Sequence, residues 1–225
     1  MWALRCINEA SMHEDNCFIT LTYDDYKLTD DYDGGLHKDH FQKFMKRLRK
    51  RFSNAKIRYF LCGEYGSQRQ RPHYHALLFG FDFNDKEFYK DTGAGYLYTS
   101  KILNELWGYG NCLIGDVTVS SASYVAGYII KKQFGRDNIK DYVDLSTGLL
   151  KEKEYVTMSR RPGIGRDFFL DFKNDIYPKD FIVIGGVKYK PPRFYDNMLD
   201  DVALRQIKSS RVDNAKKFLD NSTQQ

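Results

Sequence analysis

The chain has 225 residues, of which 42% are hydrophobic, so it is long and apolar enough to bury a real core. This composition excludes a disordered protein. No apolar run approaches the roughly 20 residues that a membrane-spanning helix needs, and the N-terminus lacks the apolar segment of a signal peptide. We therefore expect a soluble protein that stays in the cell where it is made.

The positive charge is modest overall but concentrated in one segment. A net charge of +5 permits a polyanionic partner without requiring one. Residues 41–63 contain no acidic side chain, whereas they carry Lys43, Lys46, Arg47, Arg49, Lys50, Arg51, Lys56 and Arg58. A solvated helix face usually mixes both signs, so this block favours nucleic acid or another polyanion. The 17 tyrosines and 16 phenylalanines suit base stacking as well as core packing.

The cysteines give no sign of a metal module or a disulfide scaffold. They are Cys6, Cys17, Cys62 and Cys112. Their wide spacing contains no Cys-X-X-Cys pair, and a chain of this length needs no disulfides to fold. We expect all four to be reduced.

In chain order, the first half alternates helix and strand signals. Residues 1–12 and 39–52 have apolar side chains at helical spacing, with Asp39 as the expected N-cap of the second helix. Residues 18–23, 57–64 and 73–79 are rich in aromatic and β-branched side chains, which is typical of strands. The polar loop between the last two strands predicts a hairpin.

The second half is expected to contain fewer strands. After Gly80 the sequence predicts a polar linker, a helix over 100–107 and a strand over 113–119. The next helix is expected to begin at Ser120 or Ser121, both good caps, and to extend to residue 132. Beyond it we expect a hairpin over 181–189 and a polar helix over 197–219.

Two histidines in the strand over 73–79 are candidates for a metal site. Side chains alternate along a strand, so His73 and His75 share one face, roughly 7 Å apart, and can bind one ion. In a symmetric hairpin Glu64 lies opposite His73 and Cys62 opposite His75, so Glu64 can add a carboxylate. Two alternatives stay open: the histidines are ordinary half-buried residues, or a one-residue shift turns Glu64 to the other face as a surface carboxylate.

The helix after residue 120 presents two tyrosines and a lysine on one face, namely Tyr124, Tyr128 and Lys131. The opposite face is aliphatic and consists of Val125, Ala126, Ile129 and Ile130. Tyrosines at this spacing usually pack in a core, but the aliphatic face already fills that role. A tyrosine with a pKa of about 10 becomes a nucleophile with help from a cation or a polarised substrate, and Lys131 can stabilise the charge. Gly127 costs the helix about 1 kcal/mol relative to alanine, which a close approach of DNA would explain.

These segments together resemble the ordered motifs of the HUH rolling-circle replication initiators. The matching stretches are FITLTY (18–23), RPHYH (71–75) and YVAGYIIKK (124–132). CGEYG (62–66) and SRRPGIG (159–165) are similar to the replication initiators of microvirus phages, especially the gokushovirus-like branch. The resemblance extends from about residue 2 to residue 169. It departs from the family in two ways: a cysteine-rich segment found upstream in related proteins is missing, and some two-tyrosine initiators have a lysine at the position of Gly127.

The resemblance implies an α+β fold, with a central antiparallel β-sheet flanked by helices as in RRM-like and ferredoxin-like domains. Residues 1–170 would form the nicking and joining endonuclease domain, and residues 171–225 an extension with a hairpin and an accessory helix. Mn²⁺ or Mg²⁺ would bind through His73, His75 and Glu64 and polarise a phosphate of single-stranded DNA. One tyrosine would cleave first, giving a 5′-phosphotyrosine and a free 3′-hydroxyl, and the second would act in the next round. We expect Tyr124 to be the first and Tyr128 its partner, although the sequence does not assign the order.

The same resemblance suggests the partners. The residues expected to contact DNA are Arg71, Lys132, Arg160, Arg161, Lys46, Arg47 and Lys50. The segment around Arg160 and Arg161 is equally compatible with an ordinary Pro-Gly turn. The sequence contains no nucleotide-binding loop, so strand separation is expected from a host helicase, with synthesis by a host polymerase. We expect a monomer in the bacterial host cytoplasm, without membrane contact.

Two other functions remain compatible with these residues. One is an HUH transposase or plasmid relaxase, against which the phage-like flanking motifs count. The other is a non-catalytic single-stranded nucleic-acid-binding module whose aromatic side chains stack on bases. Paired tyrosines opposite an aliphatic face argue against this second alternative, since a pure binder has no need of them.

Overall fold

The computed structural model describes the chain apart from residues 30–33, 68–69, 135–141, 144–147, 149 and 223–225, and it does not describe the side chains of residues 128–134 and 217–222. The chain divides into two compact units, Trp2–Ile164 and Gly165–Gln225. The larger unit contains the helices and strands α1 (Trp2–Ala10), β1 (Asn16–Leu21), α2 (Asp25–Thr29), α3 (Lys38–Arg51), β2 (Arg58–Tyr65), β3 (Pro72–Phe79), β4 (Lys86–Asp91), β5 (Tyr96–Ser100), α4 (Lys101–Trp107), β6 (Cys112–Gly115), α5 (Val119–Phe134) and β7 (Tyr155–Met158).

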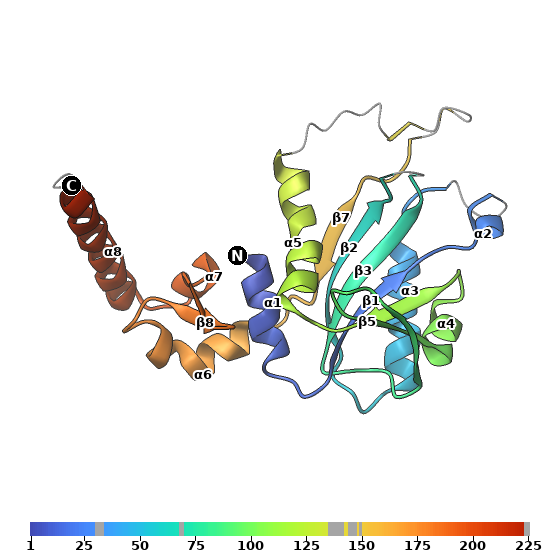
Figure 1. The fold of residues 1–225 in the computed structure, drawn as a ribbon, viewed down its shortest axis with the longest axis horizontal. Coiled ribbons are helices and arrows are strands. Elements are labelled where there is room, and N and C mark those ends of the chain that lie inside the picture. The colour runs from blue at the N-terminus through green and yellow to red at the C-terminus, as the bar shows by residue number, and fades with distance from the viewer. Residues whose placement is uncertain (30–33, 68–69, 135–141, 144–147, 149, 223–225) are drawn as a thin grey trace. The chain divides into compact units, whose positions relative to one another are not determined.

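The strands of this unit form one antiparallel sheet, which confirms the expected α+β fold (Figure 1). The strand order is β4-β5-β6-β1-β3-β2-β7, so β3 lies inside the sheet between β1 and β2. The β2–β3 hairpin has the expected register, because Glu64 pairs with His73 and Cys62 pairs with His75.

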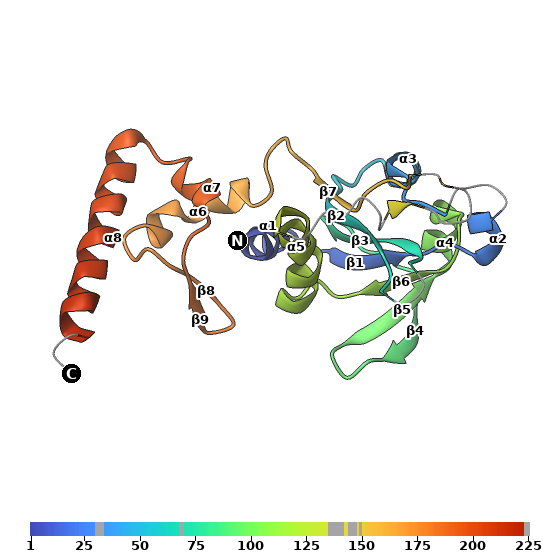
Figure 2. The same ribbon diagram turned by 90° about the horizontal axis from the view of Figure 1, so that it is seen from above.

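Helices cover both faces of the sheet (Figure 2). On one face, Leu77 and Phe79 of β3 pack in a core with residues of α1 and α5, including Cys6 and Val125. On the other face, the alternate residues of β3 pack against α3 and α4 in a larger, aromatic core. Burial on both sides explains why β3 is a nearly continuous apolar run after its histidines.

Several sequence-based expectations about these elements were wrong. The expected linker after Gly80 contains the β4–β5 hairpin. Asp39 is not the cap of α3, because the N-cap position is His37 without a side-chain cap, and Asp39 pairs with Lys43 at 2.7 Å. The helix expected from Ser120 or Ser121 begins one residue earlier, at Val119.

The start of α5 is fixed by two reciprocal hydrogen bonds. The Ser121 backbone N–H donates to Thr118 Oγ1 at 3.1 Å, and the Thr118 N–H donates to Ser121 Oγ at 2.8 Å. This arrangement is a capping box in which a serine replaces the usual glutamate. Ser121 therefore takes part in the cap, but from inside the first turn.

The smaller unit consists of α6 (Arg166–Ile176), β8 (Ile182–Ile184), β9 (Val187–Tyr189), α7 (Arg193–Asp196) and α8 (Asp201–Ser222). The expected hairpin is confirmed as β8–β9, and the expected polar helix begins later, as α8, after the short α7. Arg211 of α8 binds Asp180 and Asp196 at 2.6 and 2.7 Å, which holds the helix within this unit.

The four cysteines are buried and free of disulfides. Across the described part of the chain, no helix is both long enough and apolar enough to span a membrane.

Candidate metal and nucleophile site

One oxygen of Glu64, on β2, contacts three side chains from two other elements, β3 and α5. Its Oε1 lies 3.0 Å from His73 Nε2, 3.0 Å from His75 Nε2 and 2.8 Å from the Tyr124 hydroxyl, which donates to it. The β2–β3 register places Glu64 and both histidines on the same face of the sheet. Tyr124 reaches them from α5, which packs over this face. The structure thus brings together four of the residues proposed from sequence.

The electrostatics of this cluster favour an ionised carboxylate. Burial raises the pKa of Glu64, but hydrogen bonds from His73, His75 and Tyr124 outweigh it and bring the pKa to about 2. Burial lowers the pKa of His75 despite its contact with Glu64. For His73, burial also acts downward, but the Glu64 carboxylate prevails and raises the pKa. Burial and the same carboxylate raise the pKa of Tyr124, so this tyrosine carries its proton while it contacts Glu64.

Further contacts orient the two imidazoles. His73 Nδ1 lies 3.0 Å from the Arg71 carbonyl oxygen, and His75 Nδ1 lies 2.9 Å from Thr20 Oγ1 on β1. The Phe18 ring stacks against His75 with ring centroids 5.5 Å apart. In both histidines Nδ1 thus lies within hydrogen-bond distance of a protein oxygen, and Nε2 points toward Glu64. This is the arrangement expected of imidazoles that bind a metal.

The cluster fits a divalent metal ion. The candidate ligand atoms of Glu64, His73 and His75 lie within 4.8 Å of one another. Two imidazoles and one carboxylate suit divalent first-row metals such as Mn²⁺, and they leave coordination positions open for water or phosphate. Mg²⁺ prefers a shell of oxygen ligands, so the donor set favours Mn²⁺ of the two ions expected from sequence.

Tyr124 reaches Glu64 from a partly exposed side of α5. Its side chain is 46% exposed, whereas Val125 is fully buried and Ala126 nearly so. Val125 and Ala126 of the aliphatic face thus pack in the core, and the Tyr124 hydroxyl points to Glu64. The side chains of Tyr128, Lys131 and Lys132 lie outside the part of the chain that the structure describes.

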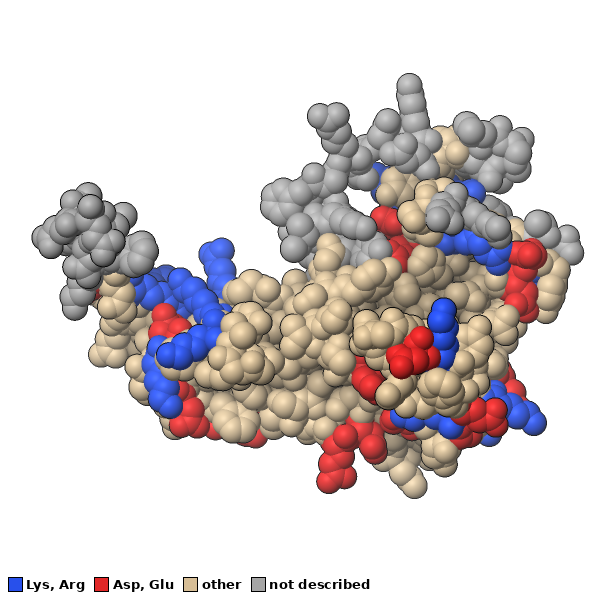
Figure 3. All heavy atoms as spheres, in the orientation of Figure 1, with Lys and Arg blue, Asp and Glu red and all other residues tan. Residues whose placement is uncertain are grey.

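Among the described residues, the basic side chains of α3 that are proposed as DNA contacts lie away from this cluster. Lys46 and Lys50 are exposed on α3, which covers the opposite face of the sheet. Arg47 on the same helix donates to the carbonyl oxygens of Leu106 and Trp107 at 2.7 and 3.0 Å. Figure 3 shows the face that carries α5 and the β4–β5 hairpin, where acidic and basic side chains both appear among uncharged residues.

Three other proposed DNA contacts, Arg71, Arg160 and Arg161, lie on loops. Arg71 precedes β3 and binds the Asp25 carboxylate as well as the Tyr23 carbonyl oxygen, the latter at 2.6 Å. Arg160 and Arg161 are exposed in the turn after β7. That turn is anchored beneath them, because Ile164 is fully buried in the core formed with α1 and α5.

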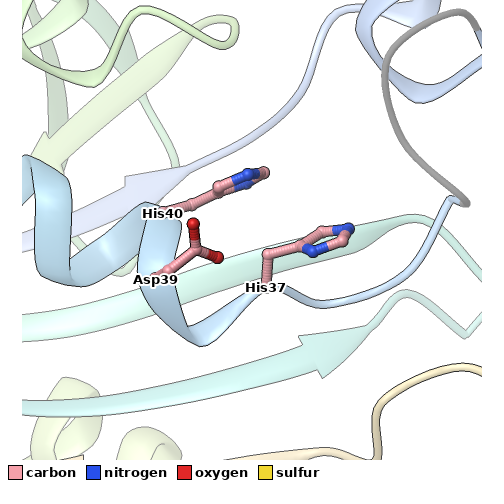
Figure 4. Close-up of side chains that lie close together, drawn as sticks. All are labelled: His37, Asp39 and His40. Atoms are coloured by element: carbon pink, nitrogen blue, oxygen red, sulfur yellow. The ribbon is translucent and has the colours of Figure 1, made fainter.

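A second group with possible metal ligands lies on the opposite face, at the start of α3. His37, Asp39 and His40 have ligand atoms within 4.8 Å of one another (Figure 4). The rings of His37 and His40 are stacked, with centroids 4.6 Å apart, and His40 Nδ1 lies 2.7 Å from the Tyr23 hydroxyl. Stacked rings do not direct their nitrogens at one point, and Tyr124 is on the other side of the sheet. The Glu64 cluster, with Tyr124 beside it, is therefore the candidate site considered below.

Two residues that shape the site were not singled out from the sequence. Thr20 and Phe18 both contact His75 from β1, which pairs with β3 so that Thr20 lies opposite His75. A strand pairing between β1 and β3 would have indicated this contact, but nothing in the sequence specifies which strand lies beside β3.

The site thus consists of a strand with two histidines inside an antiparallel sheet and a helix with a tyrosine that packs over it. The family model of the ORF2-type replication-associated proteins matches residues 16–133, which include every side chain of the Glu64 cluster. The chain belongs to this family.

Three viral replication-associated proteins are similar to the chain. It is 36% identical to the replication-associated protein ORF2 of Spiroplasma virus 4 over 97% of its own length and 70% of that protein's. It is 33% identical to the replication-associated protein VP4 of Bdellovibrio phage phiMH2K, over 87% of the chain and 61% of the relative. The replication-associated protein ORF4 of Chlamydia phage 1 is 30% identical, with 88% and 49% covered. No solved structure matches the chain.

Proposed function

We propose that this protein is a replication initiator endonuclease that nicks single-stranded DNA at a phage origin through a tyrosine and later rejoins the ends. One observation carries the proposal: the Tyr124 hydroxyl shares one oxygen of Glu64 with the Nε2 atoms of His73 and His75. A nucleophile and a candidate metal site therefore meet at one point. Membership of a family of replication-associated proteins supports the same function.

In the proposed reaction, the Tyr124 oxygen attacks a DNA phosphorus atom and forms a phosphotyrosine bond to the 5′ side. The bond from phosphorus to the 3′ oxygen breaks, and the 3′ oxygen leaves as a hydroxyl after taking up a proton, which balances the one lost by the phenol. A divalent ion held by Glu64, His73 and His75 would polarise the phosphate oxygens. Glu64 positions the Tyr124 hydroxyl, and rejoining is the reverse attack by a 3′-hydroxyl on the phosphotyrosine.

Tyr128 is proposed as the second nucleophile. It lies four residues after Tyr124 in α5, a spacing that places two side chains about 6 Å apart on one helix face. With two tyrosines, one can hold a DNA end while the other cleaves the regenerated origin. Lys131 and Lys132, seven and eight residues after Tyr124 in the same helix, are proposed to balance phosphate charge.

The DNA path and the partners are part of the same proposal. Exposed Arg160 and Arg161, together with Lys46, Lys50 and Arg71, would contact the DNA backbone. Host helicase and polymerase would supply strand separation and synthesis, and the protein would act as a monomer in the bacterial cytoplasm. Residues 1–170 would carry the endonuclease and residues 171–225 the accessory part.

A gel assay for a covalent adduct tests the proposal. Labelled single-stranded DNA from the source genome is incubated with protein, with and without Mn²⁺, and separated under denaturing conditions. We expect a metal-dependent adduct that Tyr124→Phe greatly reduces and that the double variant with Tyr128→Phe abolishes. Tyr189→Phe, in the smaller unit, serves as the matched control and should behave as wild type.

The outcomes separate the alternatives. An adduct lost in Tyr128→Phe but kept in Tyr124→Phe would reverse the order of the tyrosines. Binding without any adduct, on DNA shown to contain the origin, would refute the endonuclease and leave the non-catalytic binding module. A transposase or relaxase would instead form adducts on the ends of a mobile element or at a plasmid transfer origin in preference to the phage origin.

A further inference from the structure

A pocket of about 330 Å³ opens directly beside the nucleophile. It lies between the turn of the β4–β5 hairpin, strands β1 and β6, and the first turn of α5. His75 and Tyr124 form part of its wall, so the pocket is continuous with the Glu64 cluster. A volume of this size admits one nucleobase with space to spare, at the lower end of the range for small-molecule sites.

One residue that lines the pocket, Gly115, has no side chain. Gly115 ends β6 opposite Phe18 of β1, and both line the pocket. A Cβ at position 115 would lie 3.6 Å from both Phe18 Cδ1 and Leu97 Cδ2, which is ordinary van der Waals contact. An alanine would therefore fit without displacing the backbone. A longer side chain would extend between Phe18 and Leu97 into the space of the pocket.

The charge of the residues that line the pocket favours one kind of ligand. Within the described part of the chain, no lysine or arginine lines the pocket, but Asp116 does. A carboxylate repels a phosphate group, so the DNA backbone does not belong here. The aromatic ring of Phe18 and the apolar side chain of Leu97, with polar groups from Asp116 and Ser120, suit an uncharged planar base with hydrogen-bond donors.

We propose that this pocket receives the base of a nucleotide adjoining the scissile phosphate, and that it prefers a base with an exocyclic amino group over thymine. The proposal rests on the proposed function, because Tyr124 and His75 connect the pocket to the reacting phosphate. Aspartate accepts hydrogen bonds from amino groups such as cytosine N4, whereas the exocyclic groups of thymine on its pairing edge are carbonyl oxygens. Asp116 and Gly115 thus determine specificity, and neither touches the reacting atoms.

Two variants and one control separate this role from a general effect on folding. Gly115→Leu fills the pocket, and Gly115→Ala is its matched control at the same position. Asp116→Asn keeps the shape of an exposed side chain but removes its charge, so it tests the pocket even if leucine at position 115 disturbs the fold. Thermal unfolding of each variant shows whether the structure is retained.

The first measurement is binding of fluorescent oligo-dC and oligo-dT of equal length, by anisotropy, at one fixed salt concentration. Wild type is expected to bind oligo-dC about tenfold more tightly, within the range of a good base contact. Asp116→Asn should reduce this preference, and Gly115→Leu should abolish it, while Gly115→Ala keeps it. Equal binding of the two oligonucleotides by wild type, or an unchanged preference in both Asp116→Asn and Gly115→Leu, would overturn the proposal.

The second measurement is the rate of adduct formation on an origin oligonucleotide whose nucleotides on either side of the cleavage point are replaced in turn by an abasic unit. One of these replacements should slow wild type about 10- to 100-fold, as loss of a stacked base does. On intact DNA, Gly115→Leu should form the adduct as slowly as wild type does on that abasic substrate. Its rate should fall little further on the abasic substrate. If the wild-type protein forms the adduct on both abasic substrates as fast as on intact DNA, the pocket proposal is refuted but the nicking reaction is not. Absence of any adduct with wild type would refute the nicking reaction, and the binding comparison would still decide the pocket.

Discussion

Replacement of Thr20 by valine tests whether the Glu64 cluster binds metal through oriented imidazoles. The Thr20 hydroxyl lies 2.9 Å from His75 Nδ1. When Nε2 of His75 gives its lone pair to a metal ion, Nδ1 carries the proton and donates to Thr20 Oγ1. Without metal, the hydroxyl can rotate and donate to Nδ1, so that Nε2–H faces Glu64. Thr20 therefore supports both states, and valine supports neither.

The expected loss follows from the type of contact. Removing a side chain that orients a metal-binding histidine typically lowers metal affinity about 10- to 100-fold, which corresponds to about 1.4–2.7 kcal/mol. The folded state loses one hydrogen bond, about 1 kcal/mol. Valine keeps the β-branched shape that suits strand β1, so the sheet should remain intact.

Calorimetric titration with Mn²⁺ measures the effect. Thr22→Val is the matched control, since it also removes one hydroxyl hydrogen bond, from Thr22 Oγ1 to the Asn111 carbonyl oxygen at 2.6 Å, but does not contact His75. We expect weaker binding in Thr20→Val and unchanged binding in Thr22→Val. Wild-type affinity in Thr20→Val, or an equal loss in both variants, would refute the assigned role of Thr20.

Three further predictions concern stability and the tyrosine helix. Arg58→Ala should lower the free energy of unfolding in urea by about 3–5 kcal/mol, because it breaks the buried ion pair between Arg58 and Glu9; an effect below about 1 kcal/mol would contradict this. Burial and the neighbouring His37 lower the pKa of His40 to about 4 from 6.5. The unfolded chain thus binds more protons in this range, and stability should fall, on the order of 2 kcal/mol, as pH drops from about 6.5 to 4. Urea titrations should show a flatter pH profile for His40→Gln, and an equally steep profile would exclude His40 as the cause. Gly127→Ala should raise the free energy of unfolding by about 1 kcal/mol, since the added Cβ meets no atom within 4 Å. The same substitution should slow adduct formation. An unchanged rate would show that close approach of DNA is not the reason for the glycine.

The central hairpin and its cluster could be predicted from sequence because their signals are local. The loop between β2 and β3 is short, both strands are apolar, and the alternation of side chains then places Glu64 beside His73 and His75. The open alternative, a one-residue shift of Glu64 to the other face, is excluded by this register. Tyr124 is a long-range contact, yet the orientation of its helix is indicated by the buried Val125 on the opposite side.

The β4–β5 hairpin could not be predicted in the same way. β4 is the edge strand of the sheet, and its residues Lys86–Asp91 are mostly exposed, so they show no apolar alternation. Its stability comes from backbone pairing with β5, which side-chain patterns do not reveal. The pocket beside Tyr124 was invisible for the same reason, since the turn of this hairpin forms one of its walls.

Three arginines of the basic block have structural contacts that the sequence did not reveal. Arg47 and Arg49 direct their guanidinium groups to backbone carbonyl oxygens, and Arg58 is buried against Glu9. These arginines fasten α3 and β2 to their neighbours. Lys46, Lys50 and Lys56 of the same block are exposed and can meet a polyanion.

The positions of His73 and His75 depend on contacts that β3 makes on its opposite face. Tyr74 lies between the two histidines in sequence and points to the opposite face, where its hydroxyl lies 2.9 Å from the Tyr23 hydroxyl, accepts from the His37 N–H at 2.9 Å and lies 3.0 Å from the His37 carbonyl oxygen. A one-residue slip of β3 would take this hydroxyl from its partners and turn His73 and His75 into the aromatic core. Each buried polar group left unsatisfied costs about 1–3 kcal/mol, so the slip would cost several kcal/mol. The buried tyrosine thus fixes the register that holds the histidines toward Glu64 and Tyr124.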